Sequence, residues 1–164
     1  MTGADNRYLP IYLDDHLAGA TVALHRVRRS ARAYAGTPAG EVLAPFAVEL
    51  EEERAFLAAT AERLGVHVSR YKIAGAWVAE RLGRHKPNGH LMTTSPLGAL
   101  LEVELLLGAV TAKRSGWETL ALLDDQGVEG IDRGALDRVQ AQADGQVERL
   151  TGLLDRLRPV VGRG

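Results

Sequence analysis

Two carboxylates interrupt an apolar run in the stretch LLEVELLLGAV, Leu100–Val110. Apolar residues recur in it every three or four positions, which predicts a helix. The inner face of this helix would comprise Leu100, Val103, Leu107 and Val110. Glu104 borders that face, whereas Glu102 points more than a right angle away from it. We therefore expect Glu104 in the interior of the protein and Glu102 at a solvated edge.

The same stretch is apolar on nearly every side, because Leu105 and Leu106 lie away from the predicted inner face. A helix of this kind is typically covered on two sides. Its second cover would be a short neighbouring helix or another copy of the chain. We expect a homodimer that forms through this segment.

Apolar periodicity extends in both directions from this stretch and predicts five helical segments. They cover approximately residues 10–34, 37–64, 70–82, 95–123 and 132–158. Thr37-Pro38, Ser95-Pro96 and Asp132 have the residue types that cap helix N-termini. Pro45 lies inside the second segment and predicts a kink or a later start. The fold class is therefore all-α: four long helices, with one short helix between the second and third, form a four-helix bundle.

Length and composition indicate one globular domain spanning residues 1–164, with flexible ends at 1–8 and 159–164. Apolar residues make up 46% of the chain and charged residues 25%, which is typical of soluble proteins. The net charge of −1 gives no reason to expect a nucleic-acid partner. The chain lacks cysteine, an N-terminal signal pattern and a membrane-length apolar run. We expect a cytoplasmic protein without a membrane partner.

Each long helix places one polar residue on or near its inner face. These residues are His16, Glu53, Glu104 and Gln146, and Glu49 lies at the border one turn before Glu53. A buried carboxylate needs a partner, which a histidine or a metal would supply. In an up-down-up-down bundle the four residues would lie about 9 to 18 Å from one common end. With a long crossover, Glu104 would move toward the opposite end.

Four helices with inward carboxylates and a histidine resemble the ferritin-like superfamily, whose members bind two iron or manganese ions through such side chains. The resemblance implies a fold and a metal site formed by His16, Glu49, Glu53 and Glu104. At the Glu-x-x-His offset from Glu49 this chain has Glu52. The chain also resembles a bacterial, particularly actinobacterial, family of unknown function through its YLDDHLAGA opening, its EEE-containing second helix and its NG…SPL entry.

Two functions remain open at the level of sequence. The first is a non-catalytic ferritin-like module for binding or interaction, in which His16 and the interior carboxylates form a hydrogen-bond network. The alternative is a carboxylate-bridged di-metal protein with oxidative or metal-handling activity. Nucleophilic and nucleotide-dependent chemistry is not indicated, because the chain lacks the nucleophile elbow, the phosphate-binding loop and the dinucleotide fingerprint.

Overall fold

The computed structural model describes residues 7–66 and 95–162, and all of its regular secondary structure is helical. The α-helices are α1 (Tyr8–Ala33), α2 (Pro38–Arg63), α4 (Pro96–Asp125) and α5 (Arg133–Leu157). A short 3-10 helix, η1 (Arg158–Gly162), follows α5. The described part of the chain therefore confirms the all-α class. The short helix predicted at 70–82 lies outside the described residues.

The three predicted N-caps are confirmed. The side chains of Thr37, Ser95 and Asp132 each accept a hydrogen bond from a backbone N–H three residues later. Such a bond satisfies one of the N–H groups that a helix leaves unpaired at its start. The caps thereby fix where α2, α4 and α5 begin.

The observed bounds of α1 and α2 differ only slightly from the predicted ones. α2 begins at Pro38 and continues through Pro45, so the alternative of a later start is wrong. Gly65, just after α2, has φ 71°, a conformation that glycine adopts without steric cost. α1 begins two residues before the predicted Pro10.

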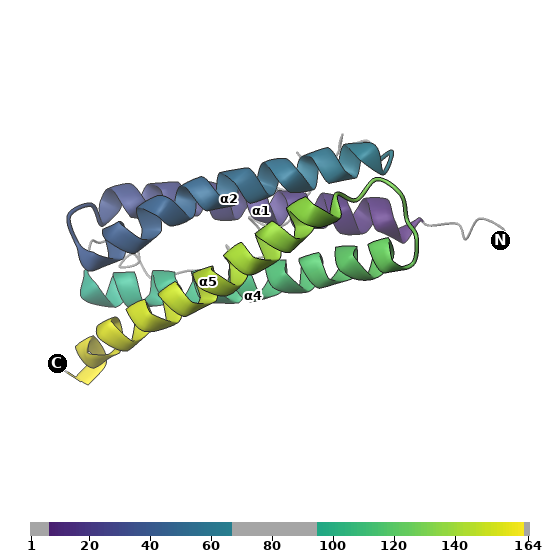
Figure 1. The fold of residues 1–164 in the computed structure, drawn as a ribbon. Helices are drawn as coiled ribbons and strands as arrows, with labels where there is room; N and C mark the ends of the chain where they lie inside the picture. Colours follow the sequence, from purple (N-terminus) through teal and green to yellow (C-terminus); the bar gives the residue numbers. More distant parts are fainter. Residues whose placement is uncertain (1–6, 67–94, 163–164) are drawn as a thin grey trace.

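The four α-helices lie alongside one another, with α5 inclined to the rest (Figure 1). α1 packs mainly against α2, and α4 mainly against α5. Contacts of α2 with α5 and of α1 with α4 complete the arrangement. α2 and α4 run in the same direction, so that the end of α2 and the start of α4 lie at opposite ends of the bundle (Figure 1).

The interior is formed mainly by leucine, valine and alanine from all four α-helices. Apolar spacing predicts inner faces of α2 and α5 that include Phe46, Leu50, Leu136 and Leu153, and these four residues are buried. The apolar spacing of α1 predicts an inner stripe that comprises Leu9, Leu13, Ala20, Ala23 and Val27, but Leu9, Ala20 and Ala23 are only half-buried. The buried positions of α1 are instead Leu13, Leu17, Ala18, Leu24, Val27 and Ser30.

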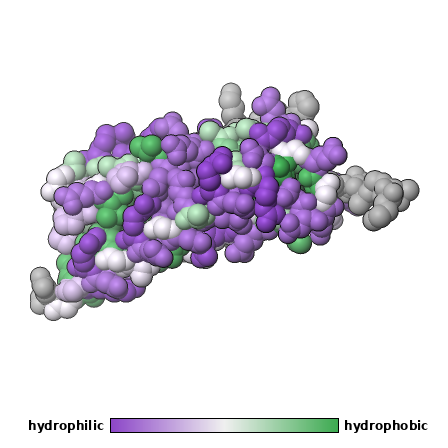
Figure 2. Space-filling view, in the orientation of Figure 1, coloured by the Kyte–Doolittle hydropathy of each residue, from purple (hydrophilic) through white to green (hydrophobic). Residues whose placement is uncertain are grey.

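The outer surface is largely polar where Figure 2 shows it. Hydrophilic residues cover most of that face, and apolar residues form separate patches among them (Figure 2). Among residues 7–66 and 95–162, no helix has the length and apolar character needed to cross a membrane.

Candidate functional site

Three polar side chains from three helices form a network in the interior. Lys113 of α4 donates hydrogen bonds to Glu53 of α2 and to Gln146 of α5. Gln146 in turn donates through Nε2 to Glu53 Oε1 at 2.9 Å. Both oxygens of the Glu53 carboxylate are therefore engaged, and Glu53 and Gln146 are fully buried. The prediction that these two residues face inward is confirmed.

Glu49 extends this network to the surface. Gln146 Nε2 also donates to Glu49 Oε2, at 3.0 Å, and Arg149 donates to the same oxygen. Each carboxylate in this network is therefore matched by one cation.

Burial dominates the protonation equilibria of the central pair. It raises the pKa of the Glu53 carboxyl, although Lys113 and Gln146 act in the opposite direction. It lowers the pKa of the Lys113 ammonium, which the Glu53 charge partly counteracts. Removal from water disfavours the charged form of both groups. The attraction between the two opposite charges offsets part of this desolvation cost.

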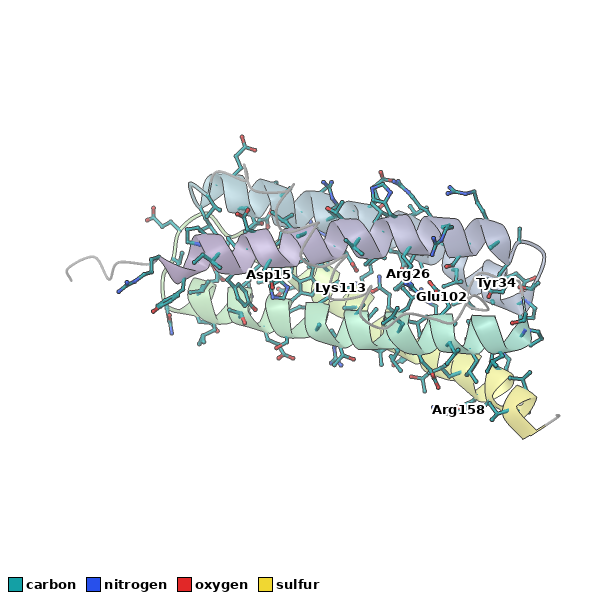
Figure 3. All side chains as sticks on the ribbon, turned by 180° about the vertical axis from the view of Figure 1, so that it is seen from behind. Asp15, Arg26, Tyr34, Glu102, Lys113 and Arg158 are labelled. Atoms are coloured by element: carbon teal, nitrogen blue, oxygen red, sulfur yellow. The ribbon has the colours of Figure 1, made fainter. Side chains whose placement is uncertain are left out.

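A second polar cluster lies between α1 and α4 and reverses the prediction for LLEVELLLGAV. Glu102 is 5% exposed and accepts two hydrogen bonds from Arg26, at 2.7 and 2.6 Å, and one from Ser30, at 2.8 Å. Figure 3 shows Arg26 and Glu102 meeting between the two helices. Tyr34 lies toward the same end, and burial together with the Glu102 charge raises the pKa of its hydroxyl.

Glu104 is exposed, so its predicted interior position is wrong. The reason is a rotation of α4 relative to the predicted face. Leu106 is buried and Leu107 only half-buried, which turns Glu102 toward α1 and Glu104 toward solvent. In an apolar helix the periodicity alone does not distinguish these two rotations.

His16 is half-buried on α1, so it is less enclosed than expected. Its ring lies beside Tyr12, with ring centroids 4.4 Å apart, and packs against Gly116 of α4. A Cβ atom at residue 116 would lie 2.9 Å from His16 Cε1, so this packing requires glycine. Burial lowers the pKa of the imidazole, although Asp15 acts in the opposite direction. No hydrogen bond joins His16 to Glu53.

A cavity of about 260 Å³ connects His16 with the Lys113–Glu53 pair. Its wall is mainly apolar and belongs to α1, α2 and α4. The apolar side chains that line it include Leu13, Phe46, Leu50, Leu57, Leu106, Val110, Trp117 and Leu120. His16 and Glu53 thus border one space, but no hydrogen bond joins them, and His16 is only half-buried.

Small residues on two facing helices account for the cavity. α1 contributes Gly19, Ala20 and Ala23 to the wall, and α4 contributes Ala109 and Ala112. Their side chains are too short to fill the space between the helices, whereas most protein interiors are densely packed. Ala109 and Ala112 are exposed, so the cavity opens to solvent between α1 and α4.

The predicted metal ligands do not converge. Glu49 and Glu53 lie in the same network, His16 lies across the cavity, and Glu104 faces outward. Within residues 7–66 and 95–162, no group of three or more His, Asp or Glu side chains could hold a metal ion.

Sequence reasoning missed Lys113. The signal was available, because Lys113 lies in one periodic series with Leu106, Val110, Trp117 and Leu120 of α4, and these four residues are all buried. A lysine on the inner face of a helix requires a carboxylate or amide partner. The pairing of Arg26 with buried Glu102 was likewise not predicted from the sequence.

Comparisons with protein-family models, with curated proteins and with solved structures gave no significant match. The described residues define an all-helical protein with an apolar cavity beside a buried lysine–glutamate pair.

Proposed function

We propose that this protein is a non-catalytic, cytoplasmic binding module that holds a small, mainly apolar molecule in the cavity between α1, α2 and α4. The cavity itself is the observation that carries the proposal. A dry protein cavity of about 150 Å³ can hold benzene, so about 260 Å³ has room for a molecule with two fused rings. Apolar walls with a few polar groups are typical of small-molecule sites.

The proposed architecture is a ferritin-like four-helix bundle with one long crossover. The parallel directions of α2 and α4 (Figure 1) support it, because the chain must return along the bundle between them. Ferritin-like bundles have one connection of this kind. In this chain the Lys113 ammonium would supply the positive charge that a metal supplies in the di-metal members of that superfamily.

The di-metal alternative has less support. Both oxygens of Glu53 already accept hydrogen bonds, and Glu104 is exposed. We expect protein purified without chelator to contain iron and manganese well below one ion per chain. Stoichiometric metal that is lost in Glu53→Ala would favour the alternative instead.

Filling the cavity provides the direct test of the binding module. Ala20 lines the cavity, and Ala20→Leu should occupy the space of the ligand. We expect naphthalene to shift the NMR signals of cavity residues in the natural chain and to leave those of Ala20→Leu unchanged. Ala141→Leu is the matched control, because Ala141 is exposed on α5. Absence of naphthalene binding to the natural chain, or equal binding to Ala20→Leu, would reject the proposal.

A further inference from the structure

The polar groups around the cavity differ in whether they already have partners. Tyr12 donates its hydroxyl to Thr119 at 2.9 Å. Lys113 and Glu53 bond to each other and to Gln146. These groups are therefore engaged before any ligand enters.

Two ring side chains on the wall have nitrogen atoms for which residues 7–66 and 95–162 provide no hydrogen-bond partner. Trp117 is 3% exposed, and its Nε1–H has no acceptor in the structure. His16 makes a ring contact with Tyr12 but no hydrogen bond to any described residue. A buried N–H without an acceptor is unfavourable, so the site would gain from an acceptor brought by a ligand.

Both of these side chains line the same cavity, His16 from α1 and Trp117 from α4. The His16 ring packs against Gly116, which immediately precedes Trp117 in α4. Tryptophan supplies only a donor, and a neutral imidazole supplies one donor and one acceptor. Each side chain therefore has an N–H group that an acceptor atom of a ligand in the cavity can use.

The charges around the cavity do not favour an ionic ligand. The Lys113 charge is matched by Glu53 in the same network. The carboxylate of Asp15 and the guanidinium of Arg54 also border the cavity, so the charged groups on its wall balance in sign. Placing an unmatched charge in an apolar space is costly. A neutral molecule fits these surroundings better than a carboxylate or an amine.

We propose that the ligand is a neutral, mainly apolar molecule with one hydrogen-bond acceptor, such as a carbonyl oxygen, which accepts from Trp117 and His16. This inference rests on the proposed function, because it assigns a chemical class to the ligand of the same cavity. The apolar body of the ligand would occupy the space beside the small residues of α1 and α4.

Three naphthalenes of similar size test the class of ligand. Binding of 2-acetylnaphthalene, 2-ethylnaphthalene and 2-naphthoate to the full chain would be measured by equilibrium dialysis. We expect the ketone to bind about tenfold more tightly than the hydrocarbon, as a hydrogen bond of typical strength implies, and the anion to bind most weakly. Water solvates the ketone better than the hydrocarbon, so this order requires a hydrogen bond inside the cavity.

Variants locate that hydrogen bond. In Trp117→Phe and in His16→Leu the preference for the ketone over the hydrocarbon should fall toward onefold. His25→Leu is the matched control, because His25 is exposed on the same helix, and it should keep the full preference. The chain has two tryptophans, Trp77 and Trp117. The indole N–H signal of Trp117 in the proton NMR spectrum is the one that is lost in Trp117→Phe and retained in Trp77→Phe. We expect this signal to move downfield when the ketone is added and to stay in place when the hydrocarbon is added.

The possible outcomes separate the two proposals. If none of the naphthalenes binds, the proposed binding module itself fails. If ketone and hydrocarbon bind equally, or the anion binds best, the module stands and the assigned ligand class is overturned. A preference that survives both Trp117→Phe and His16→Leu would also overturn it, because the acceptor would then lie elsewhere. If Trp117→Phe does not fold, the assigned ligand class is tested by the ketone preference of His16→Leu. The indole N–H signal that is retained in Trp77→Phe provides the second test.

Discussion

At the scale of single residues, the buried Lys113–Glu53 pair makes a large energetic demand on the fold. The exposed fraction of the side chain is 14% for Lys113 and 2% for Glu53. Removing one partner of such a pair leaves the other charge buried, which typically costs about 3 to 5 kcal/mol. Replacing both partners by uncharged residues costs much less. The pair therefore restricts which single substitutions the interior can accept.

We predict that Lys113→Met lowers the free energy of unfolding by about 3 kcal/mol, because it leaves the Glu53 carboxylate without its cation. The double variant Lys113→Met/Glu53→Gln should recover a large part of this loss. Urea denaturation of both variants measures the difference. The matched control is Arg28→Met, which removes one partner of the exposed Arg28–Glu51 ion pair and should change stability by at most about 1 kcal/mol. A loss in Lys113→Met no larger than in this control would contradict the prediction.

His16 makes stability depend on pH in a predictable direction. Its folded-state pKa is lowered from 6.5, so the neutral imidazole contributes stability that is fully present above pH 6.5. This contribution is lost as the pH falls through the lowered pKa. The raised pKa of Glu53 has the opposite effect, since its contribution is present at low pH and is lost as the pH rises through the folded-state pKa.

We predict that the stability of the natural chain relative to His16→Leu decreases between pH 7.5 and pH 5. Glu53 is present in both chains, so its contribution cancels to first order in this comparison. The change should stay below about 1 kcal/mol, because water still reaches part of the imidazole. Urea denaturation at both pH values gives the result. A constant difference would show that His16 titrates alike in the folded and unfolded chains.

At the scale of secondary structure elements, the orientation of α4 about its axis decides which glutamate is internal. Arg26 and Ser30 of α1 both bond to Glu102, so this carboxylate fixes the rotation of α4 against α1. We predict that Glu102→Ala lowers the free energy of unfolding by about 2 kcal/mol, because hydrogen bonds to a charged group are lost.

Glu104→Ala is the matched control for Glu102→Ala, two residues away on the same helix. Since Glu104 is exposed, its removal should change stability by less than about 0.5 kcal/mol. Thermal or urea unfolding of the two variants side by side gives the comparison. If Glu104→Ala proved the more harmful substitution, α4 would have the rotation first predicted from its sequence.

How far the sequence predicts each element depends on the kind of signal. Thr37, Ser95 and Asp132 cap helices through local bonds, so their positions could be predicted residue by residue. Whether the Glu102 side chain points into the interior depends on its hydrogen bonds to Arg26, which is 76 positions away in the chain. Periodicity in an apolar helix does not contain that information. Glu53 and Gln146 could be predicted as internal, because each interrupts a well-defined apolar stripe.

At the scale of the whole molecule, two features could not be predicted. The connection between the second and third long helices is long enough to join either the same or opposite ends, and the direction of α4 (Figure 1) decides between them. The cavity was also missed, because alanine and glycine satisfy an apolar pattern whether they pack closely or face a void. A void depends on which small residues face one another, here Gly19 and Ala20 across from Ala109 and Ala112.

The outer side of α4 has apolar side chains that are exposed to solvent in a single copy of the protein. Leu97, Leu101 and Leu105 recur every four residues and are 49%, 39% and 39% exposed. Such a series forms a stripe along the helix, and exposed apolar stripes typically mark contact surfaces. The predicted helix at 70–82, which would be another cover, lies outside the described residues. We propose that this stripe contacts the same surface of a second copy about a two-fold axis.

We predict that the full chain sediments as a dimer at micromolar concentration, and that Leu101→Lys/Leu105→Lys sediments as a monomer near 17.7 kDa. Two buried lysines in each copy would face their symmetry mates without partners, which disfavours association. Leu106 is unsuitable for this test, since it is 2% exposed and its replacement by lysine would disrupt the interior. Val48→Lys is the control, because Val48 is 59% exposed on α2 and should leave the dimer intact. A natural chain that is already monomeric, with the double variant equally stable, would mean that part of the same chain covers the stripe.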